Sequence, residues 1–211
     1  MTIRHFQTSF AILTAIFCLA GLVVSQAQDN ELRTELLAMR ERDQKARAGC
    51  PTGDPDAQLR CYAEIAESVD KPNTQRLEEI VRNVGVPSAK MVGVDGVQAF
   101  YLLLQHSQSV ELKKKSLKGI KKAFESRVLS AMDYANFTDR LLVNLGEPQV
   151  YGSNFEFKDG KLVMSRTKDV RNLDRRRHAL GLPPIAEYAR ELKETYNMDV
   201  VLPEVIFFRP R

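Results

Sequence analysis

Histidine is scarce in this chain, and one histidine lies where a polar side chain is unexpected. The chain has three histidines, and His106 ends the most apolar run found beyond the first 27 residues, residues 97–106, beside Gln105. A run that is apolar on every side predicts a buried helix, and a buried polar group without a partner costs roughly 1–3 kcal/mol. We therefore expect Gln105 and His106 to mark a polar spot in the core. An imidazole oriented by a carboxylate can transfer protons near neutral pH, so this spot favours general acid–base chemistry.

Several well-marked catalytic classes are absent from the sequence. It contains no His-Glu-x-x-His or comparable metal-ligand spacing, no Gly-x-Ser-x-Gly turn and no glycine-rich phosphate loop. Beyond residue 27 only His106 and His178 remain, which excludes a metal centre with three histidine ligands. We expect neither a metal ion nor a cofactor.

Carboxylates near apolar helical stretches are the candidate partners of His106. The candidates are Asp43, Asp95, Asp133 and Asp139. An aspartate that accepts a hydrogen bond from one ring nitrogen would orient the imidazole for proton transfer. The alternative is a core histidine whose hydrogen bond serves stability alone.

Residues 1–27 have the pattern of a secretory signal peptide. Arg4 and His5 precede a charge-free segment with an apolar centre over residues 11–24, and Ser25-Gln26-Ala27 favours cleavage before Gln28. The alternative is a retained anchor, but the apolar centre is shorter than the roughly 20 residues that a bilayer requires. We expect a periplasmic or secreted protein with no stable membrane span after cleavage.

The remaining two cysteines, Cys50 and Cys61, are a pair separated by a short segment rich in turn residues. An even pair in an oxidising compartment predicts a disulfide. A zinc site is the weaker alternative, because two thiolates need two further ligands and no histidine lies nearby in the sequence.

The charge balance is too weak to indicate nucleic-acid binding. The chain carries a net charge of +4, and an exported protein seldom meets nucleic acid. One segment, residues 113–122, is densely basic. We expect it to form a solvated helix face, with contact to anionic lipid or a wall polymer as the alternative.

Hydrophobic periodicity predicts a mainly α domain at the margin of the α+β class, with about six to seven helices and one β-hairpin. In the first helix, an apolar stripe at three- and four-residue spacing ends in Asp43 and Arg47. From Gln149 the period changes to two, and Asp159-Gly160 predicts a hairpin near residues 149–165. We expect a single domain over residues 28–196 and an apolar tail over residues 197–211 along its surface.

The polar motifs, taken together, resemble a bacterial family catalogued only as a domain of unknown function, over roughly Leu32 to Tyr188. The Cys50–Cys61 segment and the apolar tail depart from the family pattern. The motifs that carry the resemblance are Met39-x-x-x-Asp43-Gln44-x-x-Arg47, Gly85-x-Pro87, Val92-Gly93-x-x-Gly96-x-x-Ala99, Leu103-x-Gln105-His106-Ser107, Asp139-Arg140, Gly146-x-Pro148-Gln149-x-Tyr151-Gly152 and Asp174-x-Arg176-Arg177 followed by Gly181-Leu182-Pro183-Pro184-Ile185-Ala186-Glu187-Tyr188.

The resemblance implies a small, largely helical protein but no reaction, substrate or cofactor. Its motif residues are polar, and if they converge they form one pocket. His106 would then transfer protons, Asp43 or Asp139 would orient it, and Arg140 or Arg176 would bind an acidic ligand. The remaining ligand-binding candidates are Gln44, Gln105, Gln149 and Tyr151.

Two functions stay open. One is a hydrolase-like acid–base enzyme that acts on a small substrate. The other is a non-catalytic envelope module that binds a ligand, a wall polymer or a partner protein, and whose internal polar network serves only to fix the helix register.

Overall fold

The computed structural model describes residues 30–51 and 55–203. The chain divides into two compact units. Unit 1 comprises Met1–Arg76 and Pro87–His106, and unit 2 comprises Leu77–Val86 and Ser107–Arg211. The expected signal peptide lies outside the described residues, and the single-domain expectation stays a prediction.

The first described helix of unit 1 covers residues 30–48. Leu36 and Met39 are buried on the stripe that the sequence predicts, and Asp43 continues this stripe without any exposure to solvent. The helix thus carries a carboxylate into the core.

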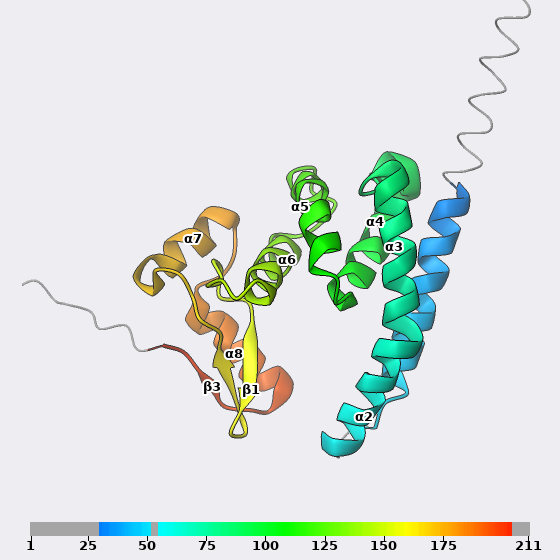
Figure 1. Cartoon of the computed structure of the whole chain (residues 1–211). Coiled ribbons are helices and arrows are strands. Elements are labelled where there is room, and N and C mark those ends of the chain that lie inside the picture. Colours follow the sequence, from blue (N-terminus) through cyan, green and yellow to red (C-terminus); the bar gives the residue numbers. More distant parts are fainter. Residues whose placement is uncertain (1–29, 52–54, 204–211) are drawn as a thin grey trace, which may run out of the picture. The chain divides into compact units, whose positions relative to one another are not determined.

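A long helical run begins at Pro55 (Figure 1). It consists of α2 (Pro55–Ile65), a π-helical turn η1 (Ala66–Asp70) and α3 (Lys71–Val84). A new α-helix, α3, begins at Lys71, one residue before Pro72, and continues the run without a break. The wide turn, in which the Lys71 amide donates to the carbonyl of Ala66, ends immediately before Pro72, whose ring has no amide hydrogen to donate.

Helix α4 (Ala89–His106) is kinked at Gly93. Gly93 has a φ of 70°, and a Cβ at this position would lie 2.7 Å from Asp95 Oδ1. The Asp95 carboxylate pairs with Arg33, with its two oxygens accepting from Nε at 3.0 Å and from Nη2 at 2.6 Å. The ion pair connects α4 to the helix of residues 30–48.

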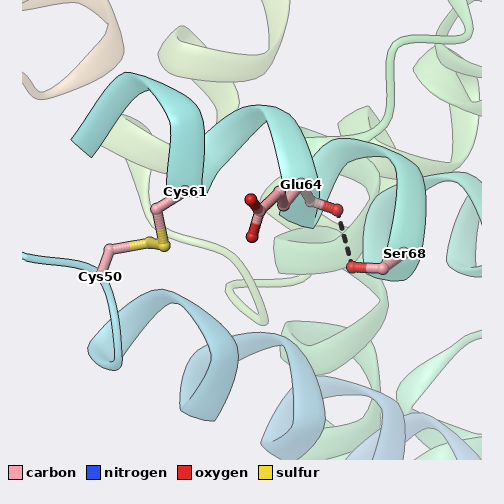
Figure 2. The surroundings of a disulfide bond; sticks show 4 residues. All are labelled: Cys50, Cys61, Glu64 and Ser68. Atoms are coloured by element: carbon pink, nitrogen blue, oxygen red, sulfur yellow. Dashed lines mark hydrogen bonds between the residues drawn. A yellow bond between two sulfur atoms is a disulfide. The ribbon is translucent and has the colours of Figure 1, made fainter. Parts of the chain in front are cut away.

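A disulfide joins Cys50, just after the first helix, to Cys61 in α2, as predicted (Figure 2). Two turns along the same run, the Ser68 hydroxyl donates to the carbonyl of Glu64 at 2.7 Å. A further cross-connection comes from Arg76, which pairs with Glu35 at 2.6 Å. Unit 1 therefore fixes its first helix at several points along its length.

Unit 2 contains two packed helices, α5 (Val110–Glu125) and α6 (Ala131–Asn144). Ser109 caps α5 by accepting from the Leu112 amide, and Ser130 forms a capping box with Asp133 at the start of α6. The remaining helical segments are η2 (Val170–Asn172), α7 (Leu173–Leu180) and α8 (Ile185–Tyr196).

The predicted hairpin is present in unit 2 and gains a third strand. Strand β1 (Phe155–Lys158) pairs antiparallel with β2 (Lys161–Met164). Asp159 and Gly160 both have positive φ, as a two-residue type I′ turn requires. From the expected tail, β3 (Val200–Val201) adds parallel to β2.

The fold class is thus mainly α with a small β part, as predicted. None of the described helices is both long enough and apolar enough to cross a membrane.

Removing the disulfide should destabilise unit 1. Closing a loop of this size is worth about 3 kcal/mol in the chain-entropy model. We expect the Cys50→Ser, Cys61→Ser double variant to unfold at a lower urea concentration than the wild type. Urea titrations followed by circular dichroism, with and without reductant, measure this difference. Reductant should lower the urea midpoint of the wild type to that of the variant. If neither the double substitution nor the reductant changes the midpoint, the disulfide does not stabilise unit 1.

Candidate functional site

The His106 ring contacts the carboxylate of Asp43. Nδ1 of His106 lies 2.9 Å from Oδ1 of Asp43. Asp43 is fully buried, whereas the His106 side chain is 24% exposed. The end of α4 and the buried stripe of the first helix therefore form a carboxylate–imidazole pair with one solvent-accessible member, as proposed from the sequence for these two residues.

Arg47 links this pair to a second carboxylate. It lies one helical turn after Asp43, and its Nε and Nη2 are each 3.2 Å from Asp43 Oδ1. Nη2 also donates to Oδ1 of Asp70, at the end of the π turn. A single guanidinium thus holds two largely buried carboxylates.

The position of Arg47 decides which nitrogen of the ring carries the proton. Nε of Arg47 is 3.1 Å from Nδ1 of His106, but Nδ1 cannot accept from Arg47 and donate to Asp43 at the same time. If Nδ1 carried no proton, its lone pair would face an oxygen of the buried carboxylate at 2.9 Å, and the two would repel each other. With a proton on Nδ1, both His106 and Arg47 donate to Asp43. We therefore assign the proton to Nδ1, which leaves Nε2 as an acceptor.

The surroundings of Asp43 determine its charge state. Burial acts to raise the pKa of Asp43, but hydrogen bonds from His106 and Gln44 outweigh it, so the net pKa lies below the ordinary value. For Arg47, burial acts to lower the pKa, and the hydrogen bonds to Asp70 and Asp43 raise it overall. Both side chains are therefore charged at neutral pH.

Three side chains of this cluster could each offer a ligand atom to a metal ion. The atoms of Asp43, Asp70 and His106 lie within 4.8 Å of one another. However, Arg47 is within hydrogen-bond distance of all three residues and already supplies the positive charge. A metal ion at this point would have to displace the guanidinium, so we assign no step to a metal.

Of the two glutamines proposed from the sequence, Gln44 contacts the pair and Gln105 contacts a tyrosine of its own helix. Gln44 Nε2 donates to Asp43 Oδ2 at 2.8 Å, and Gln105 Nε2 donates to the Tyr101 hydroxyl at 2.7 Å. Gln44 also lines a shallow depression of about 880 Å³ whose described lining residues all belong to the first helix. Gln44 supports the carboxylate rather than the ring.

Asp139 belongs to unit 2 and is fully buried there. Its oxygens accept from the backbone amides of Val150, Tyr151 and Ser153 at 2.7–3.1 Å, and from the Ser153 hydroxyl at 2.8 Å. The carboxylate thus holds the segment before the hairpin against α6. The carboxylate that contacts His106 is Asp43.

Three other polar side chains of unit 2 donate hydrogen bonds to backbone carbonyls in or near this segment. Gln149 Nε2 donates to the carbonyls of Asn154 and Ser165. Arg176 Nε donates to the carbonyl of Val150. Arg177, fully buried, donates from Nη1 to the carbonyl of Tyr151 and lies 5.1 Å from the centre of the Tyr188 ring.

The other two candidates of unit 2 are Arg140 and Tyr151. Arg140 Nε donates to Asn154 Oδ1 at 2.8 Å. Tyr151 contributes its backbone to Asp139 and its ring to a tilted contact with Tyr134, and burial raises the pKa of its hydroxyl. The candidates thus form two groups, one in each unit, rather than one set within a single unit.

Sequence reasoning placed neither Arg47 nor Asp70 in the site. Arg47 was visible as a motif residue one helical turn after Asp43, a spacing that places two side chains side by side. Asp70 had no comparable signal, because the π turn that positions it leaves no distinct pattern in the sequence.

The lowered pKa of Asp43 predicts a pH-dependent contribution to stability. This contribution is present above the ordinary value of 3.8 and is lost as the pH falls through the lower folded-state value. We expect Asp43→Asn to be less stable than the wild type at neutral pH, and the gap in melting temperature to shrink below about pH 4. Asp159→Asn, in the exposed hairpin turn, is the control. If the difference in melting temperature between the wild type and Asp43→Asn stays constant down to about pH 2, the Asp43 carboxylate is not charged in the folded protein.

A family comparison is consistent with the resemblance seen in the sequence. Comparisons with curated proteins and with solved structures gave no match. One family model matches residues 30–201, and it is described as a family of unknown function, DUF6624. The match covers both units, including every residue of the two polar groups. The chain belongs to the DUF6624 family.

Proposed function

We propose that this chain is an exported, hydrolase-like acid–base enzyme whose reacting group is His106. The observation that carries the proposal is the 2.9 Å contact of Nδ1 with the fully buried Asp43. Asp43 orients the ring and stabilises the imidazolium that forms on proton uptake. This is the arrangement in which a histidine acts as a general base.

The assigned tautomer gives each ring nitrogen one task. Nδ1 donates to Asp43, and Nε2 is left to take a proton from a water molecule as that water attacks the substrate. The same nitrogen then returns the proton to the leaving group. The partial exposure of His106 provides the access that this exchange requires.

The charge of the cluster favours a neutral substrate. Two carboxylates, Asp43 and Asp70, face a single guanidinium, so the cluster carries a net negative charge with the ring neutral. The acidic ligand expected from the sequence relied on Arg140 or Arg176, and both donate to partners within unit 2. Neutral esters, amides or glycosides therefore fit the site better than phosphate esters.

Export is part of the proposal. It is supported by the signal-like pattern of residues 1–27 and by the disulfide between Cys50 and Cys61, a bond typical of oxidising compartments. These two features support a periplasmic or secreted location.

A second candidate is a non-catalytic envelope module with a purely structural polar cluster. One observation favours it: Asp43 pairs with both Arg47 and His106, and Arg47 also pairs with Asp70, so each of the four side chains has a partner inside the cluster. A network that satisfies itself in this way can fix helix register without binding anything.

Activity assays with histidine variants separate the two candidates. The wild type is tested on neutral 4-nitrophenyl esters and glycosides, with 4-nitrophenyl phosphate alongside. We expect turnover of a neutral substrate, and we expect His106→Gln to lower kcat by about 10²–10⁴, the usual contribution of general acid–base catalysis.

His178→Gln is the matched control, because His178 is exposed on α7. It should keep wild-type activity, and both variants should keep the circular dichroism spectrum of the wild type. If no neutral substrate is turned over and His106→Gln is markedly less stable than His178→Gln, the structural candidate replaces the enzyme.

A further inference from the structure

One lysine of the basic run does not lie on a solvated face. Lys113 is only 2% exposed, whereas Lys114 and Lys115 beside it are exposed. The expectation of a solvated helix is therefore wrong for Lys113, which lies on the buried side of α5 with Leu112. An ammonium in such a place is unusual, because lysine is almost never fully buried unless it is paired.

Lys113 has no carboxylate partner among the described residues, where the ion pairs of α5 are formed by Lys115 and Lys121. Burial and, to a smaller extent, the positive charge of Arg140 on α6 together lower the pKa of Lys113 to about 8. Arg140 thus adds a second positive charge where α5 packs on α6, and no acidic side chain in the described part of the chain pairs with Lys113.

A hydroxyl group beside Lys113 also lacks a partner. Ser116 lies one turn further along α5, is fully buried, and its Oγ makes no hydrogen bond within the described chain. Residues three apart on a helix are neighbours on one face. Arg140 uses Nε to hold Asn154, and the rest of its exposed guanidinium remains available for a ligand.

These groups share one chemical property. An ammonium and a guanidinium only donate hydrogen bonds, and a hydroxyl can donate as well. A donor set with excess positive charge is suited to an anion with several acceptor oxygens. We propose that Lys113, Arg140 and Ser116 bind a small oxyanion, a phosphate or a carboxylate, where α5 meets α6 in unit 2. This site is independent of the chemistry proposed for His106.

Phosphate titrations of thermal stability test the site. The full chain is melted in increasing sodium phosphate at constant ionic strength, with potassium chloride as the balancing salt. Phosphate at about ten times its dissociation constant should raise the melting temperature by about 3 °C. Lys113→Met should abolish the rise and Arg140→Gln should reduce it. Lys114→Met, the exposed neighbour, should respond as the wild type does.

A parallel series with sodium acetate distinguishes the two classes of oxyanion, since a rise in either salt that depends on Lys113 supports the site. A second measurement does not require the variants to fold: acetic anhydride labelling of the wild type, read by mass spectrometry, should modify Lys113 more slowly when the stabilising anion is present. The proposal is overturned if neither anion raises the melting temperature beyond potassium chloride, if Lys113→Met responds like Lys114→Met, or if labelling of Lys113 is unaffected.

Discussion

The burial of Asp43 is the constraint on which the rest of unit 1 depends. Its carboxylate continues an apolar stripe on the first helix and is fully buried. An unpaired charge in such a place would cost several kcal/mol, so its neighbours must supply donors. Arg47 and His106 do so, and Gln44 satisfies the second oxygen. The end of α4 therefore has to meet the first helix at this level.

The π turn contributes by bringing a second carboxylate to the same guanidinium. Without Asp70, the single charge of Arg47 would balance that of one carboxylate. With Asp70, the guanidinium is shared between two carboxylates, so the cluster around the His106 ring has an excess of negative charge. An irregular turn ahead of Pro72 thus affects the electrostatics of the site, in agreement with the frequent occurrence of π turns at functional positions.

Unit 2 also contains a fully buried aspartate, but its partners are of a different kind. Asp139 accepts from three backbone amides and a hydroxyl, all in one short segment. Such a carboxylate fixes a loop and leaves no side chain for chemistry. In unit 1 the partner is an imidazole, which retains a second nitrogen after Asp43 is satisfied. This difference is why we place the proposed reaction at His106.

Much of this arrangement could be predicted from local sequence patterns. The stripe ending in Asp43, the Asp159-Gly160 turn and the Cys50–Cys61 bond all follow from spacing or residue type. The role of Asp70 and the burial of Lys113 could not, because both depend on contacts between segments distant in the sequence. The same limit explains why Asp43 and Asp139 could not be told apart as partners of His106.

The most direct test of the account is the protonation pattern of the His106 ring. Two-bond proton–nitrogen correlation spectra of the ¹⁵N-labelled protein at neutral pH distinguish a protonated from a bare ring nitrogen, and the signals lost in His106→Gln assign this ring. The account predicts a protonated Nδ1 that donates to Asp43 and a bare Nε2. A bare Nδ1 with a protonated Nε2 would mean that the ring accepts from Arg47, and it would contradict the proposed role of His106 as a general base.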